Sequence, residues 1–359
     1  MRESVRVGIV GAGWVARNRH LPAFTRDPRA RILGIADHSA QRAREVAAKS
    51  RIPYYTTDPL ELFGRVEVVS ICTPPWTHAE LSIQALQAGC HVLVEKPMAI
   101  TPDESRAMAA ASAASQRFLC VCHNFLFSRS AQCALRLLAR GAIGQPLSLL
   151  GYQLSSWRRR IPQWYGRLPG GLFFDEAPHM LYLIRAFLGD LRVVTARLGG
   201  DASGRLSRVQ TSLQSERGEA QIEMLAGTPV SEWMLIVVGS EGVVAIDLFR
   251  DVALHLRSDG RHVPVDVLAT SLRAVTQHLA GVFASGTLFM RRRLSYGHDR
   301  LIRQFIDAAL GHGPLPVTTA DGMAIVRMLN AIITNGRAEG TGIEEELTAA
   351  EVRHDGALE

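Results

Sequence analysis

Short, continuous apolar runs separated by helical stretches fill the first third of this chain, and they constrain its fold more than any other feature. The runs are VRVGIV, ARILGIAD, VEVVSIC, HVLVE and RFLCVCHN, and the last of them ends at Asn124. Strands that are apolar without alternation are typical of a parallel sheet buried on both faces, with helices as the crossovers. The pattern therefore predicts an α/β domain over residues 1–124.

A different pattern follows Asn124, in which strand follows strand with few helices between. The segments are SLLGYQLSSW, RVVTARL, RVQTSLQS, EAQIEML, EWMLIVVG, GVVAIDL and VALHLR. Turn residues separate them, which predicts an α+β domain over 125–340 with an open, mostly antiparallel sheet and helices on one face. Helices are expected near 297–310 and 320–333. The acidic tail, 341–359, is expected to be partly disordered.

A glycine-rich turn joins the first expected strand to the first expected helix. In GIVGAGWVA the turn is made by Gly11, Gly13, Trp14, Val15 and Ala16. Glycines in a G-x-G-x-x-A turn let the backbone approach a pyrophosphate, which lies at the positive end of the helix. Asp37 ends the next strand, where a carboxylate can accept hydrogen bonds from both ribose hydroxyls. The alternative is a plain tight turn in which Asp37 caps a helix.

These residues predict a nicotinamide dinucleotide cofactor and bear on which one is used. The carboxylate of Asp37 repels a 2′-phosphate, so NAD is favoured. Arg42 follows five residues later and can in principle reach a phosphate, which keeps NADP possible.

Composition excludes several classes of partner. The net charge is +6, but acidic and basic residues are mixed, and no zinc-finger spacing, RNP-like aromatics or long basic arm is present, so we expect no nucleic acid. The five cysteines include no C-x-x-C pair and indicate a reducing compartment. MRESVRVGIV enters a strand pattern without an apolar leader, and no apolar stretch approaches the roughly 20 residues of a membrane span. We therefore expect a cytoplasmic protein without membrane or metal partners.

Several longer motifs occur together in one order. They are NRHLPAF (18–24), VSICTPPWTHAE (69–80), VEKP (94–97), GGLFFDEAPH (170–179), HDRLIRQFIDAAL (298–310) and PVTTADG (316–322). Over nearly its whole length the chain resembles the family of glucose-fructose oxidoreductase, inositol 2-dehydrogenase and the rhizopine-catabolism protein MocA. The resemblance implies a Rossmann domain and an open mixed sheet, one face of which walls the active site. The other face would join subunits into a homodimer or homotetramer.

The resemblance also implies roles for the turn after the strand VEVVSIC. Thr73 and Pro74 in this turn would run beside the cofactor. His78 would contact the cofactor or make a structural hydrogen bond. An ordinary proline-stiffened loop is the alternative for the turn.

Lys96 is one of only two lysines in a chain with forty Lys and Arg residues. It follows the strand HVLVE at its carboxyl end, where open parallel sheets bind their ligands. An ammonium is a compact donor whose pKa falls on desolvation, whereas a guanidinium keeps its charge and its planar fork. We expect Lys96 to hydrogen-bond the reacting oxygen and Glu95 to orient the lysine or the cofactor. A surface lysine left by an arginine-biased genome is the alternative.

Asp175 and His179 are four residues apart, which brings them to one face of a helix. The helix is expected to begin at Asp175, because Pro178 then lies in the first turn, where a proline costs no hydrogen bond. The structural alternative for Asp175 is a role as the N-cap of this helix. We expect His179 to act as the general acid or base and Asp175 to hold a neighbouring hydroxyl or tune His179. The family often has glycine where this chain has Ala177 and an acidic residue where it has Tyr182.

Together these expectations describe an NAD-dependent oxidoreductase for a secondary alcohol or ketone of a sugar, amino sugar or cyclitol. Asn124, Trp164 and Tyr165 are further candidates for lining the pocket, because aromatic faces suit sugar C–H surfaces. Three alternatives stay open. They are a redox-neutral enzyme of epimerase or glycosidase type that keeps NAD bound, a non-catalytic ligand-sensing regulator, and a reductase of an imine or a linear tetrapyrrole.

Overall fold

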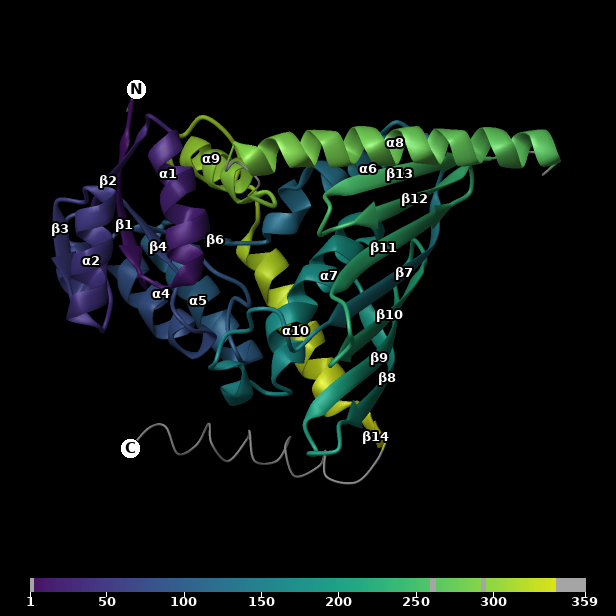
Figure 1. Ribbon diagram of the computed structural model, residues 1–359. Coiled ribbons are helices and arrows are strands. Elements are labelled where there is room, and N and C mark those ends of the chain that lie inside the picture. The colour runs from purple at the N-terminus through teal and green to yellow at the C-terminus, as the bar shows by residue number, and fades with distance from the viewer. Residues whose placement is uncertain (1–2, 259–262, 292–294, 340–359) are drawn as a thin grey trace. The chain divides into compact units, whose positions relative to one another are not determined.

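Residues 3–258, 263–291 and 295–339 are described by the computed structural model (Figure 1). The chain divides into two compact units. Residues 1–124 with 297–327 form the first, and 125–296 with the chain from 328 onward form the second. The break at Asn124 coincides with the change of sequence pattern. The return of 297–327 to the first unit differs from the expectation, which kept 125–340 together.

A six-stranded parallel sheet forms the centre of the first unit. Its order is β3-β2-β1-β4-β5-β6. The strands are β1 (Val5–Val10), β2 (Ala30–Ala36), β3 (Tyr54–Thr56), β4 (Val68–Ile71), β5 (His91–Val94) and β6 (Leu119–Val121). The predicted Rossmann domain is thereby confirmed. The strand order reverses between β1 and β4, and ligands of such sheets bind beyond the carboxyl ends at this point.

Helices cover both faces of this sheet. They are α1 (Leu21–Arg26), α2 (Ala40–Ser50), α3 (Pro59–Phe63), α4 (His78–Gln87), α5 (Pro102–Ser115) and α9 (His298–Ala309). A π-helical turn, η1 (Ala16–His20), leads into α1. Helix α9 packs on α1 (Figure 1), and Arg29, in the loop that follows α1, pairs with Asp307 of α9 at 2.5 Å. The apolar side of α9, including Phe305, is fully buried, so this late segment completes the first unit.

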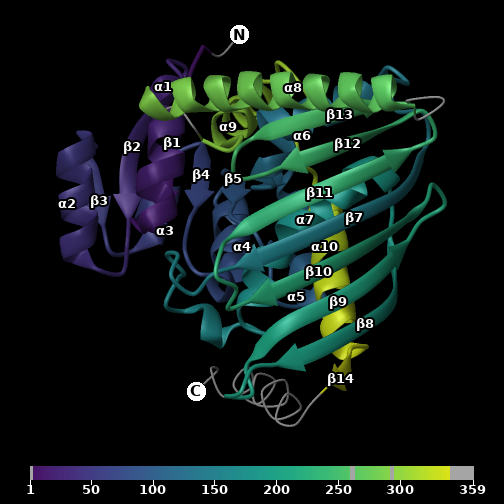
Figure 2. The same ribbon diagram turned by 45° about the vertical axis from the view of Figure 1, so that its right-hand side comes forward.

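An eight-stranded mixed sheet dominates the second unit, in the order β13-β12-β11-β7-β10-β9-β8-β14 (Figure 2). The strands are β7 (Pro146–Ser155), β8 (Arg192–Gly200), β9 (Leu206–Gln214), β10 (Glu219–Ala226), β11 (Glu232–Gly239), β12 (Gly242–Asp247), β13 (Val252–Arg257) and β14 (Arg337–Glu339). Only the β7–β10 and β8–β14 pairs are parallel. The prediction of an open, mostly antiparallel sheet is confirmed. The acidic tail from 341 lies outside the described residues.

Helices pack on one face of this sheet. Helix α7 (Leu172–Leu188) lies against β7, β9 and β10, and α6 (Arg129–Ala139) lies against β12 and β13. Helix α10 (Thr319–Thr334) begins in the first unit and ends in the second.

One long helix was not anticipated from the sequence. Helix α8 (Pro264–Met290) has 27 residues and runs along β13, the outermost strand (Figures 1 and 2). The Gln277 side chain accepts a hydrogen bond from the His255 backbone N–H at 2.9 Å and donates one to its carbonyl at 3.2 Å. An open strand edge otherwise presents unpaired backbone groups, so α8 protects this edge of the sheet.

Candidate functional site

The glycine-rich turn has the space that a dinucleotide requires. Gly11 has φ +90°, and a Cβ there would lie 2.8 Å from the Cys72 backbone, so only glycine fits. A Cβ on Gly13 would meet no atom within 4 Å, which leaves open space beside the backbone. Ala16 is fully buried and opens η1, while Trp14 is 40% exposed. These residues fit the close approach of a pyrophosphate.

Asp37 follows β2 directly and already has several partners. Its carboxylate accepts the backbone N–H of Ala12 at 2.7 Å and that of Ser39 at 2.9 Å. Arg42 donates to the same carboxylate at 3.1 Å. Arg42 is therefore held by Asp37 in this arrangement. A 2′-phosphate would have to compete with that carboxylate for the guanidinium.

The turn after β4 is held by the His78 side chain, which lies between two backbone carbonyls. His78 is fully buried, with Nδ1 2.8 Å from the Pro97 carbonyl and Nε2 2.9 Å from the Thr73 carbonyl. Burial lowers the pKa of His78, although the two carbonyls act in the opposite direction. Of the two roles predicted for His78, this geometry favours the structural hydrogen bond. Thr73 and Pro74 lie at the carboxyl end of β4, on the ligand-binding side of the sheet.

Lys96 follows β5 and is partly exposed, next to a buried carboxylate. Glu95 Oε1 lies 2.7 Å from His20 Nε2 and 3.7 Å from His298 Nε2. The other carboxylate oxygen accepts the backbone N–H of Lys96 at 3.2 Å. His20 Nδ1 lies 2.8 Å from the Ser70 hydroxyl. The backbone that carries Lys96 is thus tied to a buried network that reaches α9.

The pKa values of this network indicate an ion pair. Burial raises the pKa of Glu95, but hydrogen bonds from His20 and His298 outweigh it and hold the pKa well below 4.5. Burial lowers the pKa of His20, but two nearby thiols and the carboxylate hold it well above 6.5. Burial also raises the pKa of the Cys122 thiol to about 12, which keeps that group neutral.

The same four side chains carry atoms that can bind metals. One such atom from each of His20, Glu95, Cys122 and His298 lies within 4.8 Å of the other three. Two ligands of one zinc ion, each about 2.0–2.1 Å from it in a tetrahedron, lie about 3.3 Å apart. The 2.7 Å between His20 and Glu95 is a hydrogen-bond distance, so the arrangement is a buried ion-pair network. Sequence reasoning missed its histidines, although both lie in family motifs.

Helix α7 begins three residues earlier than expected. Gly170 and Gly171 have φ of +64° and +57°, which lets the chain turn sharply, and the helix starts at Leu172. The next apolar side chains, including Phe174, are buried and hold this first turn in the core. The prediction that the helix begins at Asp175 was wrong. Asp175 is not an N-cap, and Pro178 lies inside the helix.

His179 lies in an aromatic environment within the second unit and is 8% exposed. Its ring is edge-on to Phe125 at 5.0 Å and 5.4 Å from the Trp233 ring. Nδ1 lies 2.8 Å from the Tyr182 hydroxyl, and that oxygen accepts the Phe125 backbone N–H at 3.0 Å. Tyr182, a departure from the family pattern, therefore occupies the position of an orienting partner for His179. Asp175 is also buried, one turn earlier.

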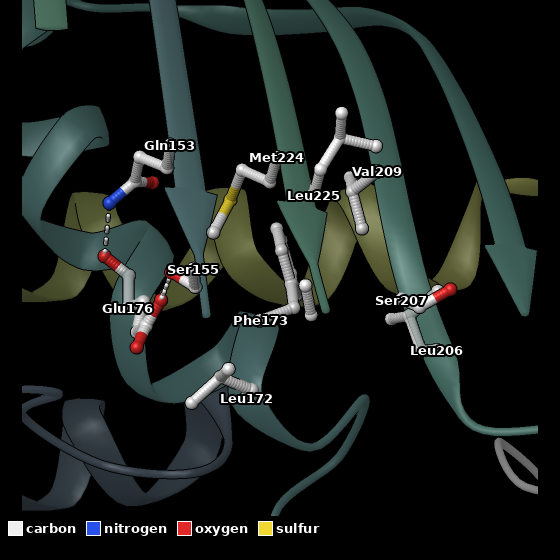
Figure 3. Close-up of a pocket in the computed structure, with 11 residues that line it drawn as sticks. Gln153, Ser155, Leu172, Phe173, Glu176, Leu206, Ser207, Val209, Met224 and Leu225 are labelled. Atoms are coloured by element: carbon white, nitrogen blue, oxygen red, sulfur yellow. Dashed lines mark hydrogen bonds between the residues drawn. The ribbon is translucent and has the colours of Figure 1, made fainter. Parts of the chain in front are cut away.

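A second buried carboxylate, Glu176, was missed by sequence reasoning (Figure 3). It accepts a hydrogen bond from Ser155 at 2.6 Å and forms an ion pair with Arg159. Gln153 donates to its backbone carbonyl at 3.2 Å. Burial lowers the pKa of Arg159, while the charge of Asp175 acts in the opposite direction. The acidic pair on α7 therefore has a cationic partner, for which the sequence offered only a short arginine run.

These residues border a small pocket between α7 and the sheet. It is lined by Gln153, Ser155, Leu172, Phe173, Glu176, Leu206, Ser207, Val209, Met224, Leu225 and Ala226 (Figure 3). The remaining predicted pocket residues lie elsewhere. Asn124 is buried after β6, and Tyr165 stacks on Trp157 at 6.2 Å with Trp164 beside it. Their roles as substrate contacts stay predictions.

A six-stranded Rossmann sheet with a G-x-G-x-x-A turn, followed by an open mixed sheet, defines a class of two-unit dinucleotide-binding proteins. The chain belongs to the GFO/IDH/MocA family within that class. A model described as "Oxidoreductase family, NAD-binding Rossmann fold" matches residues 5–123, and one described as "GFO/IDH/MocA C-terminal domain" matches residues 132–245.

Named relatives support this assignment. Inositol 2-dehydrogenase of Rhizobium meliloti is 27% identical over 70% of this chain and 78% of its own. The dTDP-3,4-didehydro-2,6-dideoxy-alpha-D-glucose 3-reductase of Streptomyces violaceoruber is 30% identical over 68% of this chain and 73% of its own. The chain spans about half the length of the first curated relatives it matches.

The solved structure of GenD2 from gentamicin A biosynthesis, in complex with NAD, has the same fold. Its TM-score is 0.75 at 24% identity, over 93% of this chain and 95% of that chain. Within the described ranges, no helix is both long enough and apolar enough to cross a membrane.

Proposed function

We propose that this chain is an NAD-dependent oxidoreductase that interconverts a secondary alcohol and a ketone on a sugar, amino sugar or cyclitol. The observation that carries the proposal is the environment of His179, a buried imidazole with one nitrogen held by a hydroxyl 2.8 Å away. Such a group is oriented for proton transfer at its other nitrogen. One relative is named a dehydrogenase of inositol and another a reductase of a dTDP-linked didehydro sugar, which supports the choice of substrate class.

Each residue has a separate task in this proposal. A bound nicotinamide would supply hydride exchange. Lys96 donates a hydrogen bond to the reacting oxygen, where negative charge develops during alcohol oxidation. His179 accepts the hydroxyl proton in oxidation and returns it in reduction. Asp175 holds a neighbouring hydroxyl or tunes His179, and Glu95 keeps the backbone of Lys96 in place.

The Tyr182 hydroxyl can pair with either tautomer of a neutral His179. Its oxygen accepts the Phe125 N–H, so its own proton can be donated to His179 Nδ1. The neutral imidazole then carries its proton on Nε2 and cannot accept one there, so ketone reduction instead uses the imidazolium, which holds a proton on both nitrogens and returns the one on Nε2. In the other tautomer Nδ1–H donates to Tyr182, and Nε2 accepts a proton from an alcohol. A carboxylate would favour the second tautomer, whereas tyrosine permits both.

The cofactor preference follows from Asp37. Its carboxylate is retained, and Arg42 pairs with it, so we propose NAD over NADP. Asp37→Ser is expected to weaken NAD binding by roughly 10-fold and to improve NADP binding, because it removes the repulsion and releases Arg42. Titration of both cofactors by protein fluorescence measures the change. Equal affinity of the unaltered protein for NAD and NADP contradicts this assignment.

Assembly through the C-terminal sheet, as a homodimer or homotetramer, is part of the proposal. One face of the sheet carries α6 and α7. On the opposite face the alternating burial of β7 and β11 leaves Leu150, Met234 and Ile236 partly exposed. An apolar face of this kind suits an isologous interface between identical chains.

A cofactor-reduction screen tests the activity. The purified protein is incubated with NAD and with cyclitols, hexoses, aminoglycosides or nucleotide sugars, and NADH is followed by absorbance, with His179→Gln as the control. We expect NADH formation with at least one compound and a loss of roughly 100-fold to 10,000-fold in the variant. Substrate epimerisation or cleavage with trapped cofactor and no free NADH would instead identify the redox-neutral alternative.

A further inference from the structure

Helix α8 exposes a long apolar stripe on the side away from β13. Its Gln277 and Gly281 face β13, where a Cβ on Gly281 would lie 2.8 Å from Val252. The opposite side carries large apolar side chains that are 41–75% exposed. They are Val265, Leu268, Leu272, Val275, Leu279, Val282, Phe283, Phe289 and Met290.

The spacing of this stripe is that of a coiled-coil seam. Counting from Val265, the central positions follow at steps of three and four residues through Leu268, Leu272, Val275, Leu279, Val282, Gly286 and Phe289. A repeat of alternating three and four residues keeps one seam facing a second helix. The repeat continues over more than three heptads, the length that distinguishes a coiled coil from chance. The spacing of the stripe therefore suits a helical partner.

The area of the stripe is sufficient for a stable interface. With side chains of roughly 150–200 Å² each, the exposed fractions amount to about 1,000 Å², and a stable complex needs about 800 Å² per partner. The largest apolar patch on a typical monomer is about 300–600 Å². The stripe exceeds that range.

We propose that α8 pairs in antiparallel orientation with α8 of a second copy of this chain. In a two-fold pair centred on residue 277, each seam position faces the one that is equally distant on the other side of the centre. Val265 then faces Phe289, and Leu268 faces Gly286. Leu272 faces Val282 in the same way, so a large side chain meets a small one in these layers.

Parallel pairing would not achieve this match. It would place two copies of Gly286 opposite each other, which leaves a void, and two copies of Phe289 together in the next layer. Voids and overpacking both cost stability, so the seam is complementary to itself in the antiparallel arrangement.

A lipid surface fits α8 less well. Helices that lie on membranes usually have a polar face rich in Lys and Arg. In α8 the only acidic or basic residues besides His278 are Asp266 and Arg273. The face opposite the stripe packs on β13. The pairing concerns a surface outside the proposed catalytic residues, so it stands or falls independently of the proposed activity. It is a contact separate from the one proposed through the C-terminal sheet, which the seam variant leaves unchanged.

The first experiment measures the mass of the full-length protein by analytical ultracentrifugation at about 10 µM. The seam variant is Leu272→Asp/Leu279→Asp, and the matched control is Ala280→Asp, at an exposed position beside the stripe. We expect the unaltered protein and the control to share one assembly state and the seam variant to fall to half that mass or less. An unaltered protein that is monomeric, or a folded seam variant of unchanged mass, overturns the proposal. So does a monomer that floats with phosphatidylglycerol vesicles.

Cross-linking tests the orientation without disrupting the seam. Residues 265 and 289 are about 36 Å apart along one helix, so they cannot form a disulfide within one chain. Antiparallel pairing brings Val265→Cys next to Phe289→Cys of the other copy. We expect the double cysteine variant to form covalent dimers on mild oxidation and the single Val265→Cys variant to form none above the unaltered protein. Dimers of the single variant would show parallel pairing, and no dimers of either variant would overturn the antiparallel pair.

Discussion

At the scale of single residues, Lys96 is the position where replacing lysine by arginine should reduce turnover most. Lys96→Ala is expected to keep NAD affinity and to lose roughly 100-fold or more in turnover, because it removes a donor that acts on the developing charge. Lys96→Arg should recover little, since the guanidinium is larger and holds its protons more firmly. Fluorescence titration of NAD and initial rates separate binding from turnover. A near-normal rate in Lys96→Arg would remove Lys96 from the chemistry.

Tyr182 offers a second test at this scale, because its hydroxyl contacts His179 and the Phe125 backbone. Tyr182→Phe keeps the ring and removes the group that orients the imidazole. We expect turnover to fall by roughly 10-fold to 100-fold while substrate KM changes little, since the loss affects proton transfer. The pH profile of the rate should also shift, as His179 loses its partner.

Tyr152→Phe is the control for that experiment. It removes a tyrosine hydroxyl from β7, away from His179, and should leave the pH profile unchanged. A Tyr182→Phe profile identical to that of the unaltered protein would show that the hydroxyl has no role in positioning His179.

At the scale of elements, the His20–Glu95 pair joins η1 to the end of β5 and should make stability depend on pH. The pKa of His20 is raised in the folded protein, so its stabilising effect is complete below pH 6.5 and declines as pH rises toward the folded pKa. Unfolding free energy should therefore fall above pH 6.5 by up to about 1.4 kcal/mol per pH unit. The pKa of Glu95 is lowered, so its contribution is retained above pH 4.5 and is lost as pH falls through the folded pKa.

His20→Gln tests this linkage by urea unfolding at several pH values. The variant removes the positive charge that pairs with the buried Glu95 carboxylate. We therefore expect the free energy of unfolding to be lower by about 3–5 kcal/mol at pH 6 and to decline less steeply above pH 6.5. His312→Gln, at an exposed histidine, is the matched control and should keep the original slope. Equal slopes in all three proteins would refute the ion pair.

The elements also show where sequence reasoning succeeds and where it fails. Five of the six strands of the parallel sheet were predicted, because each is a continuous apolar run. The three-residue strand β3 was missed, since Tyr54–Thr56 is too short to carry a pattern. The helix α8 was missed although its seam is regular, because its apolar side chains are exposed and do not mark a face that packs into a core. The start of α7 was misplaced because Pro178 was assumed to lie in the first turn.

The candidate site residues also divide into those that the sequence could suggest and those that it could not. Gly11, Asp37 and Lys96 could be proposed from the sequence because each belongs to a local motif with a physical reason, and their roles stay predictions. The partners of Glu95 and His179 could not be predicted from the sequence. Glu95 meets His298 across about two hundred residues of chain, and Tyr182 was noted only as a departure from the family. Long-range side-chain contacts of this kind depend on the fold and leave no local signal.

At the scale of the whole molecule, the first unit is built from two separate parts of the chain. A fragment of residues 1–124 lacks α9, whose buried side includes Leu301, Ile302 and Phe305. The comparison is a fusion of 1–124 to 297–327 through a flexible Gly/Ser linker. We expect the fragment to aggregate, or to have an unfolding temperature about 20 °C or more below that of the fusion, because a small domain depends on all of its buried apolar surface for stability. Circular dichroism during heating compares the two. A fragment as stable as the fusion would contradict the role given to α9.

The same discontinuity affects how the protein is made on the ribosome. About 170 residues separate the two parts of the first unit, so synthesis at ~5–20 residues per second leaves roughly 10–35 s between them. During that interval Glu95 lacks His298, and the side of α1 that later receives α9 is open to water. The nascent chain therefore exposes this surface of α1 before its first unit is complete. Slowing translation within the second unit should lengthen this exposure and reduce the yield of folded protein.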